Sequence, residues 1–231
     1  RMSKSRGNVV APDEIVDQWG TDAFRAHLAF MGPWENGGPY SEGIIGISRW
    51  LNRVWVLINS DYSKKNISGQ DEKFVRLVNQ TIQRVTYDLA EKSFNTAIAA
   101  LMELTNALSG SRERGDITDK NWNFSIKSLL LLLAPIAPHI AEELWQRSGE
   151  KKSIHLENWP TVDESALIVS EIEIPVQING KVKVKIMVPT DATETEVMEL
   201  AKTTKQIDEI LSDEAVKRVI YVENRLLNIV I

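Results

Sequence analysis

The spacing of apolar residues changes once along this chain, and that change limits the folds that the chain can adopt. Up to about residue 168, apolar residues recur three and four positions apart, as Ile44, Ile47 and Leu51 do, which is the period of an amphipathic helix. From Ile172 onward they alternate with polar residues on both sides of Asn179-Gly180, a dipeptide typical of two-residue hairpin turns. The sequence therefore predicts a mainly α fold, a helical bundle followed by a small α+β domain.

Turn-forming residues divide the helical part again. Residues 32–40 are rich in glycine and proline, so we expect connecting helices in residues 1–40, a helical domain in 41–168 and the α+β domain in 169–231. Within the helical domain, the pattern predicts one helix that stops near Gly110 and a charged loop over 111–120.

Composition excludes several classes of function. The chain has no cysteine, which excludes disulfides and thiolate chemistry and is compatible with a cytoplasmic location. No apolar run reaches the ~20 residues that a membrane span needs, so we expect a protein without membrane contact. We also expect a monomer. The net charge of −5 means that any nucleic-acid contact has to come from local basic patches.

The first residues combine cationic and hydroxyl side chains. Arg1, Lys4 and Arg6 alternate with Ser3 and Ser5, and a glycine follows directly. Such a segment can donate charge-assisted hydrogen bonds to an oxyanion while its backbone turns sharply. A solvated basic segment is the alternative that these residues alone leave open.

Arg1-Met2-Ser3-Lys4-Ser5 resembles the KMSKS signature of class I aminoacyl-tRNA synthetases. The resemblance implies that these five residues bind ATP and that Lys4 is catalytic, stabilising the triphosphate while an amino acid attacks the α-phosphate. Positioned positive charge is what phosphoryl chemistry of this kind needs. Arg1 departs from the signature, because a planar guanidinium stands where the family has its first lysine.

Further segments resemble the bacterial-type leucyl-tRNA synthetases within that class. They are Ser48–Trp55, Val176–Val182 and Arg225–Val230, in the order of that family's helical anticodon-binding domain and small C-terminal domain. Two segments between them, Phe94–Ala99 and Ala134–Trp145, resemble the helical bundle of leucyl, isoleucyl and valyl enzymes alike. The resemblance implies a C-terminal part of such an enzyme, with tRNA(Leu) as partner and leucine, ATP and Mg²⁺ as ligands of the whole enzyme. The nucleotide-binding fold with its HIGH motif, the leucine pocket and the editing domain would lie outside this chain, so we expect the isolated chain to be inactive and to hold no bound cofactor. An isoleucyl or valyl relative and a stand-alone, non-catalytic tRNA-binding module remain the alternatives.

Two sets of basic residues are candidates for tRNA binding. Arg49 and Arg53 lie one helical turn apart; their spacing alone favours a solvated face, and the resemblance shifts the interpretation towards RNA. In the predicted strand after the hairpin turn, Lys181, Lys183 and Lys185 alternate with apolar residues beginning with Val182, so all three are expected on one face, opposite a buried apolar face. A solvated sheet face and a row of phosphate contacts are both compatible with this pattern.

No metal site is predicted. His139 is the one histidine in an apolar stretch of sequence, and no second ligand stands at metal-binding spacing from it. We therefore interpret His139 as a structural residue.

Overall fold

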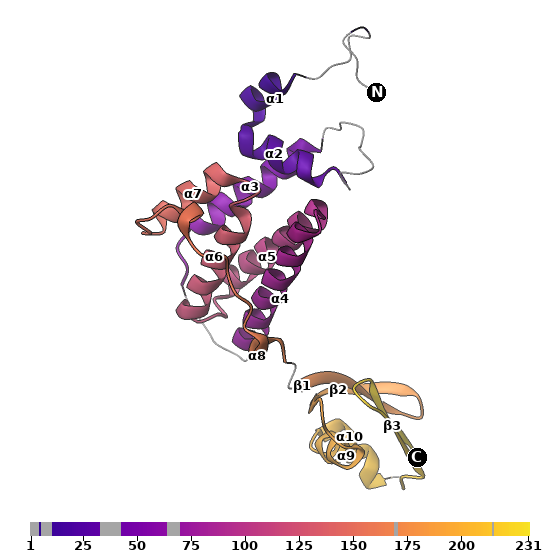
Figure 1. The fold of residues 1–231 in the computed structure, drawn as a ribbon. Coiled ribbons are helices and arrows are strands. Elements are labelled where there is room, and N and C mark those ends of the chain that lie inside the picture. Colours follow the sequence, from indigo (N-terminus) through magenta and orange to yellow (C-terminus); the bar gives the residue numbers. More distant parts are fainter. Residues whose placement is uncertain (1–4, 6–10, 33–42, 64–69, 169–170, 214) are drawn as a thin grey trace. The chain divides into compact units, whose positions relative to one another are not determined.

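The computed structural model of the protein describes residues 5, 11–32, 43–63, 70–168, 171–213 and 215–231. Contacts within the chain divide it into two units, residues 1–167 and 168–231. The first unit is helical and the second contains a four-stranded sheet with helices α9 and α10 (Figure 1). The predicted mainly α fold with a small α+β part is confirmed. The predicted borders at residues 40–41 and 168–169 touch segments outside the described residues and stay predictions.

The first unit is a series of helices. They are α1 (Pro12–Trp19), α2 (Thr21–Phe30), α3 (Ile44–Asn59), α4 (Gln70–Ala90), α5 (Phe94–Arg114), α6 (Asp119–Leu133), α7 (Pro138–Arg147) and α8 (Glu164–Leu167), with a 3₁₀ turn at Ile154–Leu156. Gly20 lies between α1 and α2 at φ 84°, a conformation that glycine adopts without the strain that a Cβ would bring.

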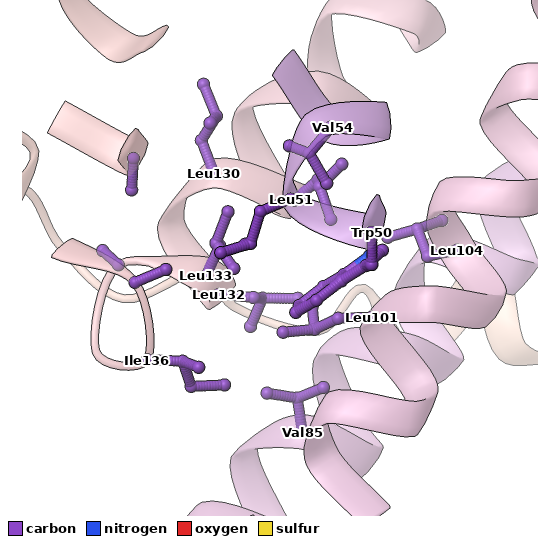
Figure 2. Packing of buried hydrophobic residues seen from close by; sticks show 14 of the residues in the cluster. Trp50, Leu51, Val54, Val85, Leu101, Leu104, Leu130, Leu132, Leu133 and Ile136 are labelled. Carbon is purple, nitrogen blue, oxygen red and sulfur yellow. The ribbon is translucent and has the colours of Figure 1, made fainter. Parts of the chain in front are cut away.

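The core of this unit forms around Trp50 of α3. Figure 2 shows its indole ring among Leu101 and Leu104 of α5 and Leu132 of α6, all fully buried. Burying each such side chain contributes about 1.5–3 kcal/mol. The indole N–H has a partner as well, because it donates a 3.1 Å hydrogen bond to Thr105 Oγ1. Trp50 therefore fixes α3 against α5 by both packing and a buried hydrogen bond.

The helix that was predicted to stop near Gly110 continues to Arg114, so the predicted helix end and the predicted loop over 111–120 are wrong. A glycine inside a helix costs about 1 kcal/mol relative to alanine. Packing offsets that cost, since Ser111, directly after the glycine, is only 1% exposed. Gly115 ends the helix instead, in the left-handed conformation at φ 65°.

The second unit is a sheet with two helices on one face. Its elements are β1 (Glu171–Ile178), β2 (Lys181–Pro189), α9 (Glu194–Lys202), α10 (Lys205–Asp213), β3 (Arg218–Val222) and β4 (Leu226–Val230). The strand order is β2-β1-β4-β3, with β1 and β4 parallel and the other neighbours antiparallel. Alternate residues of β1, among them Ile174 and Val176, are buried in one cluster with Val197 of α9 and Ile207 of α10.

The pairing of β1 with β2 contains a β-bulge that changes which residues face the core. Val176 lies opposite Val184, but Gln177 lies opposite Val182, so Lys183 has no partner in the register. Val182 is consequently 56% exposed, and the prediction that it is buried is wrong. A one-residue shift moves the following side chains to the other face. Alternation from Ile186 to Val188 follows the prediction, since both are buried.

The bulge also contradicts the prediction that the three candidate lysines of β2 lie on one face of the strand. Lys185 lies opposite Pro175, whereas Lys181 lies opposite Ile178, a residue of the buried face. The three lysines are all exposed, but they do not share one register face.

None of the helices in the described ranges is long and apolar enough to cross a membrane.

Candidate nucleic-acid interface

Helix α3 presents an exposed face that carries two arginines. Arg49 and Arg53 are both exposed and stand one turn apart, flanked by the exposed side chains of Ile45 and Val56. The helix contains no aspartate or glutamate, and neither arginine has an ion pair with any described residue. The positive charge of this face is therefore not neutralised from within α3.

The position of this face follows from the packing of α3. Its opposite side is buried against α2, α5 and α7, with Ile47, Trp50 and Val54 at most 1% exposed. A cationic face on a helix that is anchored in this way has a fixed position, which reduces the entropy lost when it binds a ligand.

The residues of the predicted ATP loop cannot be compared with the structure. Arg1, Met2, Ser3 and Lys4 lie outside the described residues, and Ser5 is exposed. Their assignment to ATP stays a prediction.

The three candidate lysines of β2 are placed differently from one another. Lys185 Nζ lies 3.0 Å from Glu173 Oε2 across the strand pair, in an ion pair whose side chains are more than half exposed. An exposed pair of this kind is worth at most about 1 kcal/mol, so the glutamate reduces the local positive charge without fixing the lysine. Lys181 and Lys183 have no ion pair with a described residue.

His139 does not lie in an apolar environment, which corrects the apolar setting that its stretch of sequence indicated. Its side chain is 72% exposed, and its Nδ1 atom lies 2.8 Å from Asp22 Oδ1. The buried histidine is His27 of α2, which is 2% exposed. The described residues contain no group of three or more histidine, cysteine, aspartate or glutamate side chains that could hold a metal ion.

Sequence reasoning missed one cationic side chain, Arg147 at the end of α7. Its guanidinium carbon lies 4.9 Å from the ring centroid of Trp55, and its Nε donates a 2.7 Å hydrogen bond to Glu143 Oε1. The spacing of Glu143 and Arg147, four positions apart on a helix, could have predicted the ion pair. The contact with Trp55 joins residues far apart in the sequence, and no spacing rule could have predicted it from the sequence.

Glu142, also on α7, holds the segment that follows this helix. Its Oε2 atom accepts hydrogen bonds of 2.9 Å from Ser153 Oγ and from Ile154 N, and its Oε1 accepts one of 2.7 Å from Gln146 Nε2. These hydrogen bonds, that from Gln146 most strongly, hold the pKa of the carboxyl below its ordinary value. The carboxylate thereby fixes the chain direction after α7.

Comparison with protein families matches residues 71–199 to a family described as the anticodon-binding domain of tRNA ligase. That match covers more than half of the chain. The chain belongs to this family. The match to the anticodon-binding family begins in α4 and ends in α9, so it crosses the border between the two units and leaves α3 outside.

Relatives of the chain match it over its whole length. A leucine–tRNA ligase of Dehalococcoides mccartyi is 44% identical over 100% of this chain and 29% of that protein, and one of Herpetosiphon aurantiacus is 44% identical over 100% and 28%. Among solved structures, the LeuRS–tRNA–LeuAMS ternary complex of Agrobacterium radiobacter K84 agnB2 matches with a TM-score of 0.71 and 32% identity, over 99% of this chain and 31% of that one. The chain thus spans less than a third of the length of these relatives.

Proposed function

We propose that this chain is the tRNA-binding part of a leucine–tRNA ligase, with tRNA(Leu) as its partner. The observation that carries the proposal is the 44% identity to leucine–tRNA ligases over the entire chain. A further relative, from Deinococcus radiodurans, has the same name and is 40% identical over 100% of the chain. These names do not favour the isoleucyl or valyl alternative.

The geometry supports α3 as part of the RNA contact. RNA backbones are bound chiefly by arginine and lysine, and arginine can engage a phosphate through two parallel hydrogen bonds. Arg49 and Arg53 offer two such groups on an anchored helix without neighbouring acidic residues in that helix. We propose that both bind phosphates of the tRNA.

The whole ligase would activate leucine with ATP and then transfer it to tRNA(Leu). In that reaction we assign Lys4 to the triphosphate, with Arg1, Met2, Ser3 and Ser5 forming the rest of the loop over ATP. The cations of Arg1 and Lys4 and the hydroxyls of Ser3 and Ser5 fit a polyphosphate, because all four can donate to its oxygens. Mg²⁺ prefers oxygen ligands and is commonly bound through substrate phosphates, so we propose that it arrives with ATP. We further propose that the ligase acts as a monomer in the cytoplasm.

A titration of tRNA(Leu) against the chain at several salt concentrations tests the RNA proposal. The double variant Arg49→Gln/Arg53→Gln should bind more weakly and reduce the slope of log K against log salt by about one unit for each lost phosphate contact. Lys73→Gln/Lys120→Gln is a matched control, because it removes the same charge from exposed positions on α4 and α6. Equal effects of the two double variants would mean that α3 contributes only general charge, and absence of tRNA binding by the unaltered chain would refute the proposed function.

A further inference from the structure

Arg147 is held on two sides. The Trp55 ring supports its guanidinium at 4.9 Å, and Glu143 Oε1 accepts the hydrogen bond from its Nε atom. A guanidinium over an indole face is stabilised by the negative charge of the ring surface. An arginine fixed in this way has already lost much of the side-chain freedom that binding a ligand would otherwise cost.

The outer part of this guanidinium is available to a ligand. The hydrogen bond to Glu143 uses Nε, and the Nη1 and Nη2 groups have no hydrogen-bond partner among the residues that the structure describes. The side chain is 53% exposed. The planar pair of Nη groups is suited to the oxygens of a phosphate or carboxylate.

Helix α7 packs against α3, and Arg147 contacts the side of α3 that carries Trp55. Ser48 of α3 and His139 of α7 line one cavity of about 370 Å³, and Trp55 and Arg147 are in contact further along both helices. With about 100° of rotation per residue, Arg49 lies about 120° round α3 from Trp55, and the exposed Asn52 lies halfway between them. On α3 itself, the residue between Trp55 and Arg49 is therefore polar and uncharged.

We propose that Arg147 binds an oxyanion of the same RNA strand that Arg49 and Arg53 contact, with Trp55 and Glu143 as positioning residues. This inference rests on the proposed function, because it assigns a third phosphate ligand to the same interface. A phosphate diester matches the site, since its two free oxygens can accept from Nη1 and Nη2 while Glu143 keeps Nε.

Salt-dependent titration of tRNA(Leu) against single variants of the chain tests the assignment. Arg147→Gln should weaken binding several-fold and reduce the salt slope by about one unit, as expected for one lost phosphate contact. Arg147→Lys keeps the charge, so the slope should remain, while the affinity falls because an ammonium cannot offer the planar pair of donors. Arg84→Gln is the matched control: Arg84 is also partly exposed and also paired with a glutamate, at 3.1 Å from Glu103, but it lies on α4.

The outcomes separate this inference from the function on which it rests. If Arg147→Gln has the same slope as Arg84→Gln while Arg49→Gln/Arg53→Gln still loses slope, the assignment of Arg147 is refuted and the proposed function stands. If the unaltered chain does not bind tRNA, the proposed function itself fails. Thermal unfolding of each variant shows whether Arg147 merely covers Trp55, because a covering role would lower the melting temperature and leave the salt slope unchanged.

Discussion

The backbone N–H of Ile140 donates a 2.7 Å hydrogen bond to Oδ2 of Asp22, which ties α2 to the first turn of α7. The backbone N–H of His139 donates to Oδ1 of the same carboxylate at 3.4 Å. A negative charge at this point also interacts favourably with the positive end of the helix dipole. One turn along α2, Arg25 Nη2 donates to the carbonyl of Pro135 at 3.1 Å. Two side chains of α2 therefore bind the connection between α6 and α7 and the first turn of α7.

Replacing Asp22 should destabilise the first unit. Asp22→Ala leaves two amide groups of α7 without their acceptor, a loss of the kind that costs about 1–2 kcal/mol at helix N-termini. Urea unfolding followed by circular dichroism measures the free energy. Asp17→Ala, at an exposed position of α1, is the control and should change the stability by less than about 0.5 kcal/mol. Equal losses in the two variants would contradict the role of Asp22.

The contribution of Glu142 should depend on pH. Its pKa is lowered in the folded state, so its stabilisation is fully present above the ordinary glutamate pKa of about 4.3 and is lost as the pH falls through the lower, folded-state pKa. Glu142→Gln should therefore melt below the unaltered chain at pH 7, and the difference should shrink in acid. Melting temperatures of both proteins between pH 7 and pH 3 give the comparison. A difference that stays constant over this range would show that ionisation of Glu142 does not stabilise the fold.

The bulge in the β1–β2 pair predicts opposite results for two valines of one strand. Val188 is fully buried, so Val188→Asp places an unpaired charge in the core and should cost more than about 4 kcal/mol. Val182 is 56% exposed, so Val182→Asp should be tolerated within about 0.5 kcal/mol. Hydrogen exchange of the amides in residues 171–231, measured by mass spectrometry, detects loss of this unit. Loss of protection in both variants would mean that Val182 is buried, as simple alternation along β2 predicts, and would contradict the bulge.

Lys4 should act in catalysis and not in tRNA binding. In a whole leucine–tRNA ligase that contains this chain, Lys4→Ala should slow adenylate formation by ~10²–10³, as for the loss of one charged contact to a transition state. Leucine-dependent pyrophosphate exchange measures that step, and a tRNA titration measures binding, which should be nearly unchanged. Equal losses in both assays would make the loop an RNA contact. The isolated chain should show no pyrophosphate exchange.

The lysines of β2 can be tested together. We expect Lys181→Gln/Lys183→Gln/Lys185→Gln to reduce the salt slope of tRNA binding by about one unit for each lysine that contacts a phosphate. The melting temperature should hardly change, because all three side chains are exposed. A slope equal to that of the unaltered chain would make this strand an ordinary solvated surface.

The spacing of apolar residues and the residue types at turns predicted the helices and strands of this fold because both signals depend on neighbours in the sequence. The helical spacing of Ile44, Ile47 and Leu51 and the Asn179-Gly180 turn depend on neighbours in sequence, and both were correct. Gly110 was misread because the weak helix propensity of glycine was outweighed by packing of the residue after it. The bulge at Lys183 leaves the alternating pattern intact in sequence, so the pattern alone could not reveal the change of face.

The candidate interface was predicted only where its residues are close together in the sequence. Arg49 and Arg53 became candidates through their one-turn spacing together with the resemblance, because the spacing alone favours a solvated face. The contact between Arg147 and Trp55 depends on the packing of α7 against α3, and no rule of spacing links the two positions. The residues of the ATP loop were assigned by resemblance alone.

The two units differ in their tryptophan fluorescence. All seven tryptophans lie before residue 160, and Trp50, Trp122 and Trp145 are buried in the core of the first unit. Indole emission therefore comes from the first unit alone. A ligand that touches Trp55 would alter this emission spectrum.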